Sequence, residues 1–272
     1  MRNSFFEEQY VAALLAQRPA DYQPDFEAAS QAMVKTCASH LDIAYGAHER
    51  QTLDIFPAGR DEKTPLILFF HGGYWRRNSK NDRRFLARKW LDAGVSFALA
   101  NYRIAPHGSL SDMCEDAIMA ARFLSENAVR FAINDRKIIL SGNSAGAHLA
   151  AIAAARANLS ICGVCLLSGL FDVRPVVHTS VADSLKLTET EATAQSPIYD
   201  KPFTAPAAIF VGSDETEAFI QQSQMLHMQR CAWGLASSYA LVKGQNHFSI
   251  TGLLGDPTSQ IGSAISDMID AP

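Results

Sequence analysis

Residues 137–157 constrain the fold more than any other part of the chain. A short apolar run, KIILS at 137–141, leads into the turn GNSAG at 142–146, and a run of small, helix-forming residues follows to Ala157. Glycines on both sides of a sharp turn let neighbouring chain segments approach closely, and the amides at a helix N-terminus favour a negative charge. The segment therefore predicts a strand–turn–helix unit that presents Ser144 as a nucleophile.

Other apolar runs alternate with helical patterns. The continuous runs 65–70, 96–102, 161–168 and 207–211 are typical of parallel strands that helices cover on both faces, whereas 51–56 alternates as an outer antiparallel strand does. Asp112 and Glu115 have capping-box spacing for a helix through Asn127. The buried face predicted for that helix comprises Met113, Ala117, Ala121 and Leu124. Two N-terminal helices are also predicted, because Phe6, Tyr10 and Leu14 recur every four positions and Phe26, Ala29, Met33 and Cys37 share one face of the second helix.

The chain shows no internal repeat or low-complexity linker, so we predict one domain over residues 1–272. Residues 1–40 should form a helical cap. The irregular stretch 171–206, with a helix beginning near Thr188, should form a lid over the site.

Composition excludes several classes of protein. Apolar residues make up 48% of the chain, charged residues 19%, and the net charge is −4, without a long basic run. Nucleic acid and anionic membranes are therefore not expected partners. Acidic residues occupy the N-terminal segment where a signal peptide needs an apolar run, so we expect a cytoplasmic protein. The five cysteines fall mostly in apolar stretches, so we expect their thiols to be reduced.

A nucleophilic serine needs a histidine base, which follows it in the chain order of this kind of sheet. Four histidines follow Ser144: His148, His178, His227 and His247. Only His247 lies in a loop after the last predicted strand, at 238–242, and we predict that it is the base.

An acid that orients the base should follow the preceding strand. Asp214 comes directly after the run 207–211 and is the predicted acid. Asp172, which follows the earlier strand, and the neighbours Glu215 and Glu217 remain alternatives.

Glycines after the strand 65–70 predict an oxyanion hole. In the sequence HGGYW at 71–75, the amides of Gly72 and Gly73, together with that of Ala145, should face a bound carbonyl oxygen. His71 should organise this loop. Tyr74 and Trp75 follow the glycines directly and are the predicted substrate-binding residues. At least one of the two rings should form a wall of the substrate pocket, and the alternative is that both pack in the core beneath the loop.

With HGGYW at 71–75 and GNSAGAHL at 142–149, the chain resembles the kynurenine formamidase (arylformamidase) branch of the α/β-hydrolase fold, which lies close to the hormone-sensitive-lipase-like esterases. The family usually has a histidine before the serine, where this chain has Asn143. Further matching segments lie at 45–46 and 51–56, at 102–106, and at 187–192 and 196–197.

The resemblance implies a mostly parallel sheet flanked by helices and a serine hydrolase that cleaves an N-formyl arylamine, such as N-formylkynurenine, or a small aryl ester through an acyl-enzyme. It implies a small-molecule substrate and no cofactor or metal. A general short-chain carboxylesterase and a catalytically silent binding protein of the same fold are the alternatives, and the sequence leaves a homodimer open.

Overall fold

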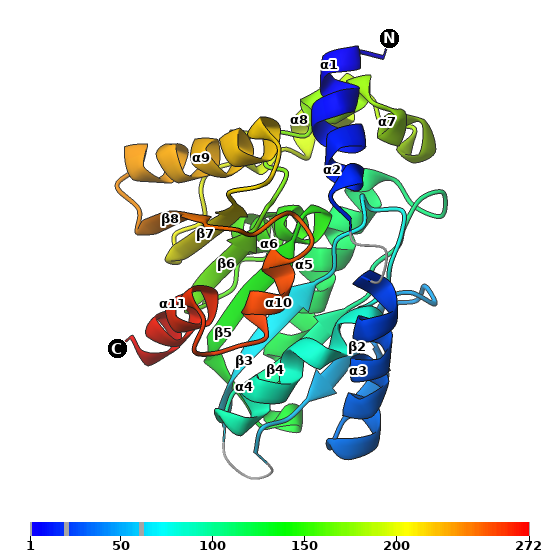
Figure 1. Ribbon diagram of the computed structural model, residues 1–272. Coiled ribbons are helices and arrows are strands. Elements are labelled where there is room, and N and C mark those ends of the chain that lie inside the picture. The colour runs from blue at the N-terminus through cyan, green and yellow to red at the C-terminus, as the bar shows by residue number, and fades with distance from the viewer. Residues whose placement is uncertain (1, 19–21, 60–62, 272) are drawn as a thin grey trace.

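A central sheet organises the structure, a computed structural model that describes residues 2–18, 22–59 and 63–271 (Figure 1). Eight strands lie in the order β1-β2-β4-β3-β5-β6-β7-β8. The first two pairings, β1 with β2 and β2 with β4, are antiparallel, and the remaining pairings are parallel. The strands are β1 (His40–Ala44), β2 (Thr52–Phe56), β3 (Thr64–Phe70), β4 (Ser96–Ala100), β5 (Ile133–Asn143), β6 (Gly163–Leu167), β7 (Ala207–Gly212) and β8 (Ser237–Val242).

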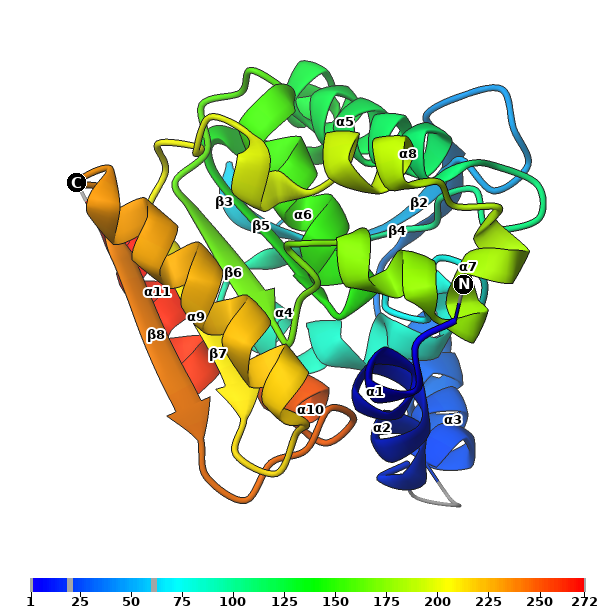
Figure 2. The ribbon, with the colours of Figure 1, turned by 90° about the horizontal axis from the view of Figure 1, so that it is seen from above.

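Helices cover both faces of the sheet, as the continuous apolar strands predicted (Figure 2). None of the helices within the described ranges is long and apolar enough to cross a membrane. The helices and single turns are α1 (Ser4–Glu7), η1 (Glu8–Ala12), α2 (Ala13–Ala16), α3 (Tyr22–Thr36), η2 (Lys80–Ala87), α4 (Arg88–Asp92), α5 (Leu110–Glu126), η3 (Ala128–Phe131), α6 (Ala145–Arg156), η4 (Arg174–His178), α7 (Ser180–Leu185), α8 (Glu189–Ala194), η5 (Pro197–Tyr199), α9 (Glu217–Ala232), α10 (Ile250–Leu254) and α11 (Gln260–Asp270).

Two apolar clusters, one on each face, form the core. The larger cluster joins α5, α6 and α9 to the sheet, and fully buried residues such as Leu68, Leu140 and Leu166 belong to it. The second cluster places Trp90 of α4 and Ile265 of α11 against the opposite face. Alternate residues along β3 and β5 point into the two clusters, which is why residues 66–70 of β3 and 138–140 of β5 are apolar without interruption.

Three details differ from the sequence prediction. β1 is the edge strand outside β2, and its alternation of exposed and half-buried residues reflects that position. The helix predicted from Asp112 begins earlier, at Leu110, because Ser109 is the N-cap and forms the capping box with Asp112. In α3 the buried face passes through Ser30 and Met33, whereas Ala29 is exposed.

Candidate active site

Ser144 stands in a strained turn between β5 and α6. Its backbone has φ 56° and ψ −123°, a conformation that non-glycine residues rarely adopt. A Cβ on Gly142 would lie 2.3 Å from the carbonyl oxygen of Gly146, and one on Gly146 would lie 2.0 Å from that of Phe70. Glycine is therefore required on both sides of the turn, as predicted, and the turn holds Ser144 at the carboxyl edge of the sheet.

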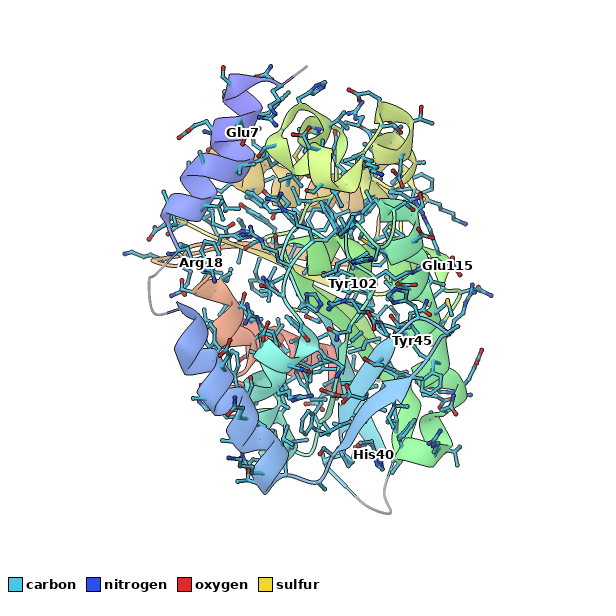
Figure 3. The ribbon with its side chains drawn as sticks, turned by 90° about the vertical axis from the view of Figure 1, so that its right-hand side faces the viewer. Glu7, Arg18, His40, Tyr45, Tyr102 and Glu115 are labelled. Atoms are coloured by element: carbon cyan, nitrogen blue, oxygen red, sulfur yellow. The ribbon has the colours of Figure 1, made fainter. Side chains whose placement is uncertain are left out.

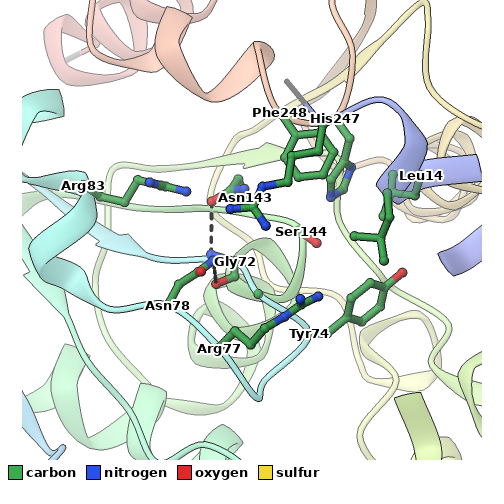
Figure 4. Close-up of a pocket in the computed structure, with 13 residues that line it drawn as sticks. Leu14, Gly72, Tyr74, Arg77, Asn78, Arg83, Asn143, Ser144, His247 and Phe248 are labelled. Atoms are coloured by element: carbon green, nitrogen blue, oxygen red, sulfur yellow. Dashed lines mark hydrogen bonds between the residues drawn. The ribbon is translucent and has the colours of Figure 1, made fainter. Parts of the chain in front are cut away.

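His247 is held by a buried carboxylate. Nδ1 of His247 donates to Oε2 of Glu215 at 2.7 Å, and the two side chains are 5% and 0% exposed. Oε1 of Glu215 accepts hydrogen bonds from the Gly212 amide at 2.7 Å and from the hydroxyl of Ser168. With Nδ1 protonated, the imidazole keeps Nε2 as an acceptor. Figure 4 shows the ring directed toward Ser144, and both residues line the same pocket.

The prediction of Asp214 as the acid is wrong in this geometry. Asp214 is exposed, and its carboxylate accepts a hydrogen bond from the neighbouring Ser213 hydroxyl at 2.8 Å. Its amide donates to the carbonyl of Gln245, in the loop that carries His247. The two adjacent side chains thus point in opposite directions, with Asp214 at the surface and Glu215 buried against His247.

The other alternative acids also lie elsewhere. Asp172 pairs with Arg174 at 2.7 Å and accepts a hydrogen bond from the Tyr199 hydroxyl at 3.1 Å. Glu217 is exposed in the first turn of α9, where it accepts a hydrogen bond from Gln221. The sequence pointed to the correct turn after β7, but no local signal distinguished the two adjacent acids.

The loop that follows β3 is built around a neutral histidine. Nδ1 of His71 donates to the Gly72 carbonyl at 2.8 Å, and the Tyr102 ring stacks on the imidazole with 4.4 Å between ring centroids. Burial lowers the pKa of His71 to about 3, so the ring is uncharged near neutral pH. Gly73 has φ 124°, and a Cβ there would lie 2.4 Å from the Arg77 carbonyl oxygen. His71 thus has the structural role that the sequence predicted.

One member of the predicted oxyanion hole already has a partner. The Gly72 amide donates to Oδ1 of Asn143 at 3.1 Å, so our assignment of Gly72 as an oxyanion donor is wrong (Figure 4). The amides of Gly73, Tyr74 and Ala145 donate to no atom within residues 2–18, 22–59 and 63–271. Gly73 and Tyr74 line the pocket with Ser144, and Ala145 follows Ser144 directly in the chain, so these three amides are the candidate donors.

Asn143 therefore ties the nucleophile turn to the oxyanion loop. We expect Asn143→Ala to lower kcat by about 10- to 100-fold with little change in KM. The reason is that a small displacement of the amides that would bind the oxyanion lowers the rate of the chemical step by a factor of this size. Steady-state kinetics on an aryl acetate would measure this split. Asn127→Ala is a matched control, since Asn127 caps α5 by a bond to the Phe123 carbonyl far from the pocket. An unchanged kcat in Asn143→Ala would show that the contact does not position the donors.

Only one of the two predicted aromatic residues lines the pocket. Tyr74 lines it, together with Leu14, Leu15 and Phe248, and the Tyr74 hydroxyl donates to the carbonyl of Tyr10. The prediction that Trp75 contributes to substrate binding is wrong. Trp75 is fully buried, and its indole Nε1 donates to Nδ1 of His148 at 3.3 Å.

His148 explains why Trp75 turns inward. Nε2 of His148 donates to the Gln195 carbonyl at 2.6 Å, which leaves Nδ1 to accept from Trp75. Burial lowers the pKa of His148 to about 4, so the ring is neutral and suited to this acceptor role. Successive residues of the loop thus point to the pocket and to the core, and the tryptophan takes the core position.

The segment that covers the pocket is the N-terminal one. Leu14, Leu15 and Arg18 line the pocket beside Ser144, whereas the described residues of 171–206 contribute none of its walls. Residues 171–206 instead support the N-terminal helices, since the Ser180 amide and hydroxyl both donate to Glu7. Figure 3 shows these helices along one side of the molecule, with Arg18 at their end.

Comparison with known proteins places this site in a family. The BD-FAE family model matches residues 53–229, more than half of the chain, from β2 into α9. The chain belongs to the BD-FAE family. The match includes the turn at Ser144 and Glu215 but ends before the loop of His247.

Relatives of this BD-FAE protein confirm the resemblance seen in the sequence. Kynurenine formamidase from Danio rerio is 29% identical over 242 residues, which cover 84% of this chain and 81% of that protein. A provisionally named thioesterase from Silicibacter sp. tm1040 superposes with a TM-score of 0.83 at 28% identity, covering 96% of this chain and 99% of that one. An esterase from Pyrobaculum calidifontis has a TM-score of 0.74 at 18% identity with full coverage of both chains. The fold is the α/β-hydrolase fold, and the protein is a hydrolase of that type.

Proposed function

We propose that this protein is a serine hydrolase that cleaves an N-formyl arylamine or a small aryl ester through an acyl-enzyme. The observation that carries the proposal is the meeting of Ser144, in its strained turn, with His247, oriented by a buried carboxylate, in one pocket. The similarity to kynurenine formamidase supports the choice of a formyl arylamine.

The chemistry follows from the order of contacts. Nε2 of His247 takes the Ser144 proton as the hydroxyl attacks the substrate carbonyl, while Glu215 stabilises the imidazolium through Nδ1. The amides of Gly73, Tyr74 and Ala145 would stabilise the oxyanion. His247 then protonates the leaving amine or alcohol, and water attacks the acyl-enzyme with the same base.

The size of the pocket favours a small acyl group. The cavity beside Ser144 has a volume of about 60 Å³, well below the roughly 300–1,000 Å³ of pockets that enclose a whole ligand. A formyl or acetyl group would fit such a space, with the leaving group directed toward the mouth. Tyr74 and Phe248 line the pocket and can contact an aromatic leaving group.

We expect N-formylkynurenine and aryl acetates to be hydrolysed, and aryl octanoate to be hydrolysed with a kcat/KM at least about 10-fold lower than that of the acetate. The physical reason is that each unburied methylene forfeits about 0.8 kcal/mol of transfer free energy, and a chain that cannot enter also displaces the carbonyl. Initial rates on aryl esters of two, four and eight acyl carbons would measure the preference, with N-formylkynurenine assayed in parallel.

A general short-chain carboxylesterase is the second candidate, because the same residues hydrolyse esters and the fold is shared with esterases. Negligible formamide turnover beside rapid ester hydrolysis would favour it. Absence of turnover and of fluorophosphonate labelling would instead leave a silent binding protein. A single domain over 1–272, a cytoplasmic location and a homodimer stay predictions.

A further inference from the structure

Arginines gather at the active-site pocket. Arg18, Arg77 and Arg83 all line it, and no aspartate or glutamate is among the described residues that do so. The three come from separate segments: the end of the N-terminal helices, the loop after β3, and η2. The chain as a whole carries a net charge of −4, so this positive cluster is a local feature and not a reflection of composition.

Arg77 is the member of the cluster best placed to bind a ligand. Its backbone amide donates to the Gly73 carbonyl at 3.1 Å, which fixes the arginine directly to the oxyanion loop. Its side chain is exposed, and Figure 4 shows it reaching toward the space beside Ser144 and Asn143. Within the described residues, Arg77 makes no side-chain hydrogen bond or ion pair.

The surroundings of Arg77 are positively charged. Partial burial lowers the pKa of its guanidinium, and the charges of Arg76 and Arg18 lower it further. Binding of an anion would stabilise such a site, because the negative charge reduces the repulsion between the guanidinium groups and accepts charge-assisted hydrogen bonds from them. A guanidinium also matches the two oxygens of a carboxylate in a bidentate arrangement.

We propose that the pocket selects substrates whose leaving group carries a carboxylate, and that Arg77 binds this carboxylate. The inference rests on the proposed function and deepens it. The cavity beside Ser144 has a volume of only about 60 Å³, so with a small acyl group held there the charged part of the substrate belongs to the leaving group. Arg18 and Arg83 add positive potential that attracts the anion to the pocket.

A pair of esters that differ only in charge tests the proposal. In 3-acetoxybenzoate and 3-acetoxybenzamide the acyl group and the size of the leaving group are the same. The amide is the more electron-withdrawing substituent, so intrinsic reactivity does not favour the carboxylate. We expect the wild-type enzyme to hydrolyse the carboxylate with a kcat/KM at least tenfold above that of the amide at low ionic strength, and this ratio to fall as salt is added.

The variants are Arg77→Gln, Arg77→Lys and Arg76→Gln. Arg77→Gln should reduce the carboxylate-to-amide ratio at least tenfold, and Arg77→Lys should retain part of it because the charge remains. Arg76→Gln is the matched control, since Arg76 donates to the Ser184 hydroxyl at 3.1 Å and does not line the pocket. It should leave the ratio unchanged. The ratio is measured within one preparation, so a partly unfolded variant does not distort it.

Failure of this inference is distinguishable from failure of the proposed function. A wild-type ratio of one or less, or a ratio that Arg77→Gln leaves intact, would overturn the role of Arg77 while ester hydrolysis at Ser144 stands. Loss of the ratio in Arg76→Gln as well would mean that general surface charge, and not the pocket, attracts the substrate. If neither ester nor N-formylkynurenine were hydrolysed, the proposed function itself would fail.

Discussion

Replacing Ser144 with alanine should lower kcat by about 10⁴-fold or more, because the nucleophile acts as a unit with its base. Alanine has the same Cβ as serine, so the strained φ of 56° costs the variant no more than the wild type. The fold should therefore be retained, with an unchanged thermal midpoint. Kinetics on an aryl acetate and labelling with a fluorophosphonate measure the two losses together.

Ser141→Ala is the matched control for that experiment. Ser141 lies on β5, three residues before Ser144, is fully buried, and donates to the Cys165 carbonyl at 2.8 Å outside the pocket. Its removal should cost about 1 kcal/mol of stability through the lost hydrogen bond and leave labelling intact. Substantial turnover in Ser144→Ala, or labelling lost only in Ser141→Ala, would contradict the assignment of the nucleophile.

Glu215→Gln should lower kcat by about 10⁴-fold, the size of effect seen when the acid of such a triad becomes an amide. An amide in this place can donate to Nδ1 of His247, which stabilises the tautomer with the proton on Nε2. Nε2 would then point a proton at Ser144 and could not act as a base. The same steady-state assay, with a thermal melt to verify folding, measures the effect.

Asp214→Asn is the comparison that gives the Glu215 result its meaning. Asp214 precedes Glu215, has the same charge and is exposed, with its carboxylate on the Ser213 hydroxyl. We expect a change of less than about threefold, as for most surface substitutions. Asp172→Asn should likewise spare turnover, because that carboxylate pairs with Arg174. A larger loss in Asp214→Asn than in Glu215→Gln would return the role to the first acid.

Local patterns predicted the scaffold because each of them has a short-range physical cause. The apolar runs that became β3, β5, β6 and β7 follow from burial on both faces of a sheet. The GNSAG turn required glycine where two backbones meet within van der Waals distance, and that requirement is visible in the sequence. The position of His247 followed from the chain order of the strands. These features were predicted correctly.

The direction of individual side chains was not visible in the sequence. Asp214 and Glu215 are adjacent acids, and which of them faces His247 depends on how the loop of His247 packs against this turn, where the Asp214 amide donates to the carbonyl of Gln245, 31 residues later. Trp75 turns to the core because His148, on another element, offers it an acceptor. Each choice depends on a partner distant in sequence, so no local pattern encodes it.

The sequence by itself predicted the fold and the two residues, Ser144 and His247, that the structure brings into one pocket, because backbone sterics and the periodicity of burial act over a few residues. Only the tertiary structure decided which carboxylate orients His247, that the Gly72 amide donates to Asn143, and that the N-terminal segment lines the pocket whereas residues 171–206 do not. It also brought together Arg18, Arg77 and Arg83, which the sequence separates by up to 65 residues. Such contacts join remote segments, and their energies depend on distances that exist only once the chain has folded.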